Sequence, residues 1–140
     1  MSLSQAESAS VEELPINGDG DVVRVRQSMR AAAIRAALSL VDQTKIVTAA
    51  SELARNTLIH GGGGVARIEV TSDHGRCGVR ATFVDQGPGI ADIELALSDG
   101  YTTGNGLGLG LSGSRRLVDS FDLESNPRRG TRVMVTKWAR

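Results

Sequence analysis

The stretch DGYTTGNGLGLGLSGSRRL, residues 99–117, has glycine at every second position from Gly104 to Gly110. Glycines leave the backbone N–H groups uncovered, and a helix that begins near Ser112 adds the unpaired N–H groups of its first turn. Together these donors predict an anion site that can surround a phosphate chain. The same composition is typical of a lid that opens and closes, and a mobile loop without any ligand is the alternative interpretation.

Two other phosphate-binding motifs do not fit this region. The pattern G-x-G-x-x-G occurs at Gly108, Gly110 and Gly113, but the dinucleotide-binding motif of that form directly follows a strand. Here the polar loop DGYTTGN precedes the pattern, late in the chain. The P-loop requires a lysine inside its glycine loop, and neither of the two lysines, Lys45 and Lys137, is near one. The sequence therefore disfavours both the dinucleotide-binding motif and the P-loop.

Length and composition indicate a single domain. The 140 residues suffice for one hydrophobic core, and we expect a flexible tail over residues 1–11 before a domain over residues 12–140. With 16 basic and 16 acidic residues the formal net charge is zero, which favours neither nucleic acid nor a membrane as partner. Neither a signal peptide nor an apolar run of about 18 residues is visible, so we expect a cytoplasmic monomer or weak dimer.

The first half of the chain predicts an edge strand and two helices. EELPI, residues 12–16, suits an edge strand because proline is tolerated there. Alternation around Val23 fits a strand, but a helix from about Asp21 to Leu40 explains more apolar positions: Val22, Val25, Met29, Ala32 and Ala36. Asp42 is then expected to cap a second helix, which the glycines of HGGGG end at Gly61.

The second half predicts a hairpin, two short helices and two further strands. VARIEVTS and CGVRATFVD alternate apolar and polar residues around a short glycine-containing link, and Cys77 falls on the apolar face, as a core residue. We expect short helices near residues 92–97 and 112–120, and strands at FDLES and TRVMVTKW around the turn NPRRG. This order predicts an α/β two-layer sandwich, with a mixed, mostly antiparallel sheet and about three helices on one face.

A carboxylate and an amide lie four residues apart on the second helix. Glu52 and Asn56 therefore stack one above the other, beside the face that carries Leu53 and Thr57. This pattern suits an acceptor for a hydroxyl proton next to an oxygen ligand for Mg²⁺. The alternative is a solvated pair on the helix surface. His60 lies nearer the apolar edge, where it fits a partner for the helix C-terminus better than a ligand.

The stretch VDQGPGI, residues 84–90, places a carboxylate at the end of an apolar strand. Asp85 is followed by Gly87 and Gly89, which let the backbone approach a flat ligand closely. A carboxylate held there can accept a hydrogen bond from an exocyclic amine such as that of adenine. A strand-ending turn with a capping aspartate is the alternative.

Taken in order, ELARN, DQGPGI, GNGLGLGL and RRGTRV resemble the ATP-binding fold shared by gyrase-type ATPases, Hsp90 chaperones, sensor histidine kinases and MutL. The resemblance runs from about Pro15 to Trp138. The stretch DQGPGIADIELALSDGYTTGNGLGLGL is most similar to the small serine kinases that control anti-sigma factor switches, in particular the stressosome switch kinases.

The resemblance implies a role for each motif. Glu52 would be the general base, Asn56 the Mg²⁺ ligand, and Asp85 the acceptor for the adenine amino group. Thr131 would support the adenine end through water. Gly87 and Gly89 would lie beside the base, and a phosphate-side lid would comprise Gly104, Gly106, Leu107, Gly108, Leu109 and Gly110.

The implied activity is transfer of a phosphoryl group from ATP to a serine of a STAS-domain protein, a scaffold or antagonist in a partner-switching stress pathway. A serine phosphatase of that pathway is an implied second partner. The alternative function is an ATP-dependent binding protein, an anti-sigma factor or phosphatase activator, whose main output is sequestration.

Overall fold

The computed structural model describes residues 11–90, 97, 111–126 and 128–140, and its strands form a single five-stranded sheet. The strands are β1 (Glu12–Ile16), β2 (Gly64–Asp73), β3 (Arg76–Asp85), β4 (Ser120–Asn126) and β5 (Gly130–Trp138). Their order across the sheet is β1-β2-β3-β5-β4, and every neighbouring pair is antiparallel. EELPI thus forms an edge strand, as predicted.

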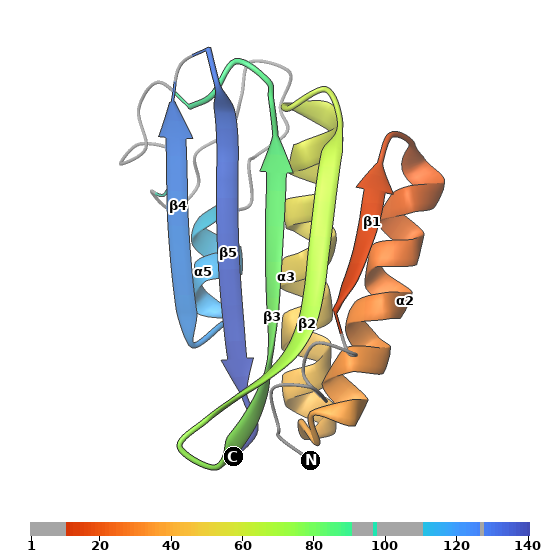
Figure 1. Ribbon diagram of the computed structural model, residues 1–140, viewed down its shortest axis with the longest axis vertical. Coiled ribbons are helices and arrows are strands. Elements are labelled where there is room, and N and C mark those ends of the chain that lie inside the picture. The colour runs from red at the N-terminus through yellow and green to blue at the C-terminus, as the bar shows by residue number, and fades with distance from the viewer. Residues whose placement is uncertain (1–10, 91–96, 98–110, 127) are drawn as a thin grey trace.

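Three helices among the described residues cover one face of this sheet (Figure 1). They are α2 (Asp19–Arg35), α3 (Leu40–Ile59) and α5 (Leu111–Arg116). The core lies between the two layers, where apolar side chains from both are fully buried, among them Ile16, Met29, Ile46, Leu53, Ile68 and Phe83. The predicted α/β two-layer architecture is confirmed. No helix in the described ranges is both long and apolar enough to cross a bilayer.

The connection between α2 and α3 differs from the prediction. α2 ends at Arg35 rather than near Leu40, and Ala37 in the turn has a positive φ of 63°. Ser39 then caps α3, since its hydroxyl accepts a hydrogen bond at 3.1 Å from the N–H of Asp42. The prediction that Asp42 is the cap was wrong, because a serine three residues earlier occupies that position. At the other end, α3 stops at the glycine run, as expected.

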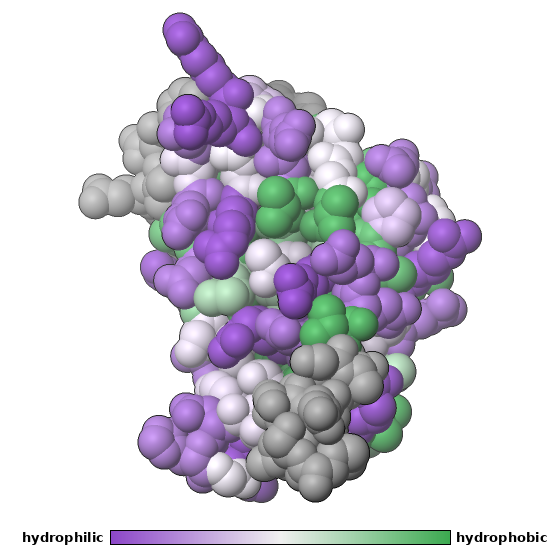
Figure 2. Space-filling view, in the orientation of Figure 1, coloured by the Kyte–Doolittle hydropathy of each residue, from purple (hydrophilic) through white to green (hydrophobic). Residues whose placement is uncertain are grey.

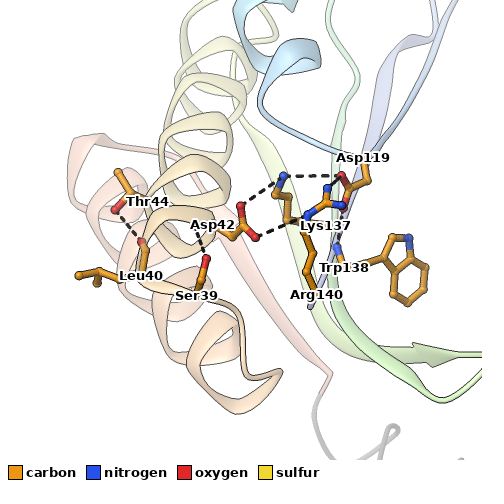
Figure 3. Close-up of polar contacts among 8 residues, drawn as sticks. All are labelled: Ser39, Leu40, Asp42, Thr44, Asp119, Lys137, Trp138 and Arg140. Atoms are coloured by element: carbon orange, nitrogen blue, oxygen red, sulfur yellow. Dashed lines mark hydrogen bonds and ion pairs between the residues drawn. The ribbon is translucent and has the colours of Figure 1, made fainter.

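Asp42 instead belongs to a buried ion cluster at the N-terminal end of α3 (Figure 3). The ammonium of Lys137, whose side chain is 5% exposed, lies 3.6 Å from a carboxylate oxygen of Asp42 and 3.6 Å from one of Asp119. Arg140 completes the cluster at 2.6 Å from Asp119. These contacts attach the start of α3 to the end of β5 and to the residue just before β4.

The β2–β3 hairpin is confirmed, although it extends beyond the helix layer. His74 and Gly75 both have positive φ, 51° and 80°, as a two-residue turn of type I′ requires. Val79 and Phe83 are buried on the side facing the helices. Cys77 has the same parity but is exposed. The prediction of a core cysteine was wrong because all residues from Asp73 to Cys77, around the turn, are exposed and none of the described helices covers them.

The C-terminal strands match the prediction, whereas the helices before them match in part. FDLES and TRVMVTKW lie in β4 and β5. α5 begins at Leu111 and ends at Arg116, four residues before the predicted end, because Ser120 already pairs with Thr136 in the sheet. The short helix predicted at residues 92–97 lies outside the described residues except for Leu97.

The other face of the sheet carries no helix among the described elements and is mainly hydrophilic (Figure 2). Arg80 pairs there with Glu69 on the neighbouring strand at 3.8 Å. Val65 and Val84 are about two-fifths exposed, at 42% and 41%. This alternation, apolar toward the helices and polar toward solvent, is typical of an antiparallel sheet with one covered face.

Candidate functional site

A pocket opens where β3 ends, α3 ends and β5 begins. Its walls come from α3 and the turn after it, from β3 and its following loop, and from the starts of α5 and β5. The lining residues are Leu53, Asn56, Thr57, His60, Gly61, Phe83, Asp85, Gly89, Ile90, Leu111, Thr131 and Val133. Four residues predicted for the site, Asn56, Asp85, Gly89 and Thr131, therefore meet in one place. Apolar side chains form the floor of the pocket, and polar groups stand at a few points, as is typical of small-molecule sites.

Asp85 is held by a cage of three glycines. A Cβ built on Gly61 would lie 2.3 Å from the Asp85 carboxyl carbon, and one on Gly130 would lie 2.0 Å from the Asp85 carbonyl oxygen. A Cβ on Gly87 would meet the Gly61 backbone at 2.7 Å. The Gly87 N–H also donates a 2.9 Å hydrogen bond to Asp85 Oδ1. No side chain larger than hydrogen fits at these positions without movement, so the backbone itself fixes the carboxylate.

A hydroxyl pair joins the start of β5 to the loop after β3. Thr131 lies directly opposite Asp85 in the sheet register and opposite Ser125 on the other side. The hydroxyls of Ser125 and Thr131 are 3.0 Å apart, and the N–H of Ile90 donates to Ser125 Oγ at 2.6 Å. This short network holds the loop that carries Gly89 against the strand ends, so the polar wall of the pocket is tied to the sheet.

The C-terminal turns of α3 form the opposite wall. The Asn56 carbonyl accepts hydrogen bonds from the N–H groups of His60 at 2.9 Å and Gly61 at 3.1 Å, which closes the helix end. Thr57 is buried, and its hydroxyl donates to the Leu53 carbonyl at 3.0 Å. Asn56 therefore lines the pocket from the hydrogen-bonded C-terminal end of α3.

Glu52 does not line this pocket. Its side chain instead lines a second hollow, on the surface between α2 and α3, together with residues such as Arg26, Arg30 and Ser51. Its carboxylate is 3.5 Å from the guanidinium of Arg55, and its side chain is 42% exposed. Glu52 and Asn56 occupy adjacent turns of one helix, as predicted, but they face two different hollows.

Other predicted positions divide into two groups. Gly87 contacts Gly61 behind Asp85 rather than the pocket itself. The predicted lid residues Gly104, Gly106, Leu107, Gly108, Leu109 and Gly110 lie outside the described residues. Among the residues that the structure describes, no three His, Cys, Asp or Glu side chains form a metal-binding group.

The sequence analysis missed several residues of the site. Gly61 was predicted only as a helix end, although it also packs against Asp85. Gly130 was predicted only as part of a turn, but its φ of 101° and its contact with the Asp85 backbone place it in the cage. Ser125 gave no signal beyond being a polar residue near the end of a strand. The only available signal was that Gly61 lies in HGGGG and Gly130 lies in RRGTRV.

Comparison with known proteins identifies the family of the chain. Residues 41–139 match the family described as histidine kinase-, DNA gyrase B-, and HSP90-like ATPase. The chain is 44% identical over 120 residues to the serine/threonine-protein kinase RsbT of Bacillus subtilis (strain 168), which covers 86% of this chain and 90% of RsbT. It is 36% identical over 104 residues to the anti-sigma F factor of Bacillus licheniformis, which covers 69% of each protein.

Two solved structures share the fold. The catalytic domain of histidine kinase ThkA superposes with a TM-score of 0.51 at 22% identity, over 91% of this chain and 97% of that one. A chain of the SiaB-SiaC complex from Pseudomonas aeruginosa gives a TM-score of 0.55 at 12% identity, over 97% and 95%. The resemblance inferred from the motifs is therefore confirmed. The chain belongs to the histidine kinase-, DNA gyrase B- and HSP90-like ATPase family and, within it, to the RsbT-like serine/threonine-protein kinases.

Proposed function

We propose that this protein transfers the γ-phosphoryl group of ATP to a serine of a STAS-domain partner in a partner-switching stress pathway. The observation that carries the proposal is the glycine-caged carboxylate of Asp85, which shares one pocket with Asn56 and Thr131. A fixed carboxylate beside apolar walls suits recognition of a flat base that bears an amino group. The family membership supports ATP as that ligand.

The base of the nucleotide would contact the strand ends. Asp85 accepts a hydrogen bond from the exocyclic amine of adenine, and Thr131 supports that end of the pocket through water. Phe83 and Val133 provide apolar surface below the ring. The cage explains why an aspartate can perform this role: its position does not depend on the ligand, so little ordering is required on binding.

Asn56 would hold Mg²⁺ together with the phosphates. Its side-chain oxygen is a hard ligand of the kind that Mg²⁺ prefers. When bound, the ion would neutralise charge on the phosphates. By family resemblance, the backbone amides of Gly104, Gly106, Gly108 and Gly110, with Leu107 and Leu109 between them in the sequence, would surround those phosphates.

Glu52 would accept the proton of the serine hydroxyl. The serine oxygen forms a bond to the γ-phosphorus, the bond from that phosphorus to the bridging oxygen of ADP breaks, and the hydroxyl proton passes to Glu52. Its side chain is 42% exposed, so an incoming acceptor can reach it. The neighbouring Arg55 keeps the carboxylate oriented on the helix surface.

A STAS-domain substrate and a serine phosphatase as second partner are proposed from the family resemblance. The names of the relatives support protein partners in general, since they include a serine/threonine-protein kinase, an anti-sigma F factor and a SiaB-SiaC complex. The similarity to anti-sigma F factors also supports a second candidate function, in which ATP-dependent sequestration of a protein is the main output.

Two substitutions test the proposal. Asp85→Asn keeps the shape but exchanges an acceptor for an amide, so ATP affinity measured by calorimetry should fall by about tenfold or more. Glu52→Ala should abolish formation of phosphoserine on the partner, measured by mass spectrometry, while ATP still binds. Glu69→Gln, on the far face of the sheet, is the matched control and should change neither.

The outcomes separate the two candidate functions. If the wild-type protein binds ATP and the STAS partner but forms no phosphoserine, sequestration is the correct function. If no ATP binds to the folded protein, or Asp85→Asn leaves its affinity unchanged, the assignment of the pocket is wrong.

A further inference from the structure

The hollow between α2 and α3, which we call the α2–α3 groove, lies outside the nucleotide pocket. Its α3 side is one helical face, with Thr44, Val47, Thr48, Ser51 and Glu52 at steps of three and four residues. Its α2 side carries Arg26 and Arg30, one turn apart. A neighbouring hollow shares Arg26, Arg30 and Val47, so the groove continues along α2 toward Val23.

The two arginines are the unpaired charges of this groove. Arg24, on the same helix, is 3.3 Å from Asp21, and Arg55 is 3.5 Å from Glu52. Arg26 and Arg30 are exposed and make no ion pair or side-chain hydrogen bond in the part of the chain that the structure describes. A guanidinium matches a carboxylate with two parallel hydrogen bonds, so this pair is suited to acidic side chains.

Glu52 marks the end of the groove that lies nearest the nucleotide pocket. Glu52 lies at one end of the α3 face, and Asn56, one turn further along, lies in the wall of the nucleotide pocket. One helical turn is about 5.4 Å, so the Glu52 end of the groove lies about one turn from the Asn56 wall of the nucleotide pocket. Val47 at the groove floor is buried, at 7% exposed, so the accessible lining of the groove is mainly polar and charged.

We propose that the α2–α3 groove is the docking site for the protein substrate, and that it recognises an acidic segment next to the acceptor serine through Arg26 and Arg30. The proposal rests on the proposed kinase function and adds the location and charge of the substrate. A nucleic acid is less suited as occupant, because the chain has no excess of positive charge, with 16 basic and 16 acidic residues. A serine flanked by carboxylates satisfies both arginines and places its hydroxyl toward Glu52.

The direct test is binding of short fluorescent peptides in low salt, measured by anisotropy. The probes share one central serine and differ in their flanks, which are glutamate, glutamine or lysine, and a single-stranded oligonucleotide serves as a second polyanion. The glutamate peptide should bind at least about tenfold more tightly than the glutamine peptide. Arg26→Glu/Arg30→Glu should remove that preference and transfer it to the lysine peptide.

A matched control is available on the opposite side of the molecule. Arg67 is also exposed and without an ion pair among the described residues, but it lies on the open face of the sheet. Arg67→Glu makes the same change per site and should leave the preference for the glutamate peptide intact. Calorimetry with ATP on each variant shows whether the nucleotide pocket is unaffected.

Three results would overturn the proposal. The glutamate and glutamine peptides could bind equally, the reversal at Arg26 and Arg30 could have no more effect than that at Arg67, or the oligonucleotide could bind as tightly as the glutamate peptide. If any of these is found while ATP still binds, the docking site is wrong and the nucleotide pocket stands. Loss of ATP binding by the wild-type protein would instead contradict the proposed function.

Discussion

Gly61→Ala tests whether the glycine cage positions Asp85. The added methyl group would lie 2.3 Å from the Asp85 carboxyl carbon and 2.6 Å from Oδ2. Ordinary contact between carbon atoms begins near about 3.5 Å, so the carboxylate has to retreat by about 1 Å. It cannot do so freely, because its other oxygen accepts the 2.9 Å hydrogen bond from Gly87. The expected cost in folding free energy is about 1–3 kcal/mol.

Gly61→Ala should also lower the affinity for ATP. A hydrogen bond to a charged group contributes roughly 1.5–3 kcal/mol, and a displacement of that size removes most of it. ATP affinity measured by calorimetry should therefore fall roughly 10- to 150-fold. Gly20→Ala is the control, since a methyl group there meets nothing within 4 Å. It should leave ATP affinity unchanged and stability equal or slightly higher.

A double-mutant cycle decides whether the clash is the cause. In an Asp85→Gly background both the carboxylate and the Cβ, which would lie 2.5 Å from the added methyl group, are absent, and Gly61→Ala should then cost little further stability or affinity. If Gly61→Ala alone remains folded and binds ATP like the wild type, the cage does not set the position of Asp85. Equal costs of Gly61→Ala in both backgrounds would show that the damage lies in the helix end and not at the carboxylate.

Two further substitutions test the fold around the site. Lys137→Met leaves Asp42 and Asp119 with Arg140 as their remaining cation, so urea unfolding should show a loss of about 2–4 kcal/mol, and adding Asp42→Leu should restore part of it. A single variant as stable as the wild type would contradict the cluster's role. Gly130→Ala combines a φ of 101° with a contact of 2.0 Å and should cost about 2–4 kcal/mol; a loss under about 1 kcal/mol would refute the packing argument.

The parts of the fold that were predictable are those that depend on local patterns. Alternation in VARIEVTS and CGVRATFVD is enough to identify a hairpin, because a half-buried strand needs it wherever it lies. The error at Cys77 shows the limit of this reasoning. Parity determines which face a side chain takes, but exposure depends on whether the other layer extends that far, and the turn of the hairpin lies beyond the helices.

The sequence also could not decide between two equivalent local signals for the start of α3. Ser39 and Asp42 are both good capping residues, three positions apart, and either could begin α3. The structure uses Ser39, and Asp42 turns toward Lys137, which is 95 positions later in the chain. That pairing depends on where β5 passes α3, so no local rule could have assigned it.

The sequence predicted several residues of the candidate site, but it did not predict the glycine packing that holds Asp85. Asn56, Asp85, Gly89 and Thr131 line one pocket, as expected, and their individual roles stay predictions. The cage depends instead on the close approach of three chain segments. Gly61 and Gly130 are remote from Asp85 in sequence, and each has an ordinary explanation as a helix end or a turn.

The four-residue spacing of Glu52 and Asn56 on α3 separates two proposed roles, contact with the acceptor serine and binding of the nucleotide. The two side chains stack on the helix, yet they face separate hollows, one closed over by the strand ends and one open between the helices. In the proposed function, a nucleotide and a protein acceptor then occupy neighbouring hollows along one side of α3. If the α2–α3 groove is the docking site, substitutions along α2 should alter which partner docks and leave ATP binding at the glycine cage unchanged.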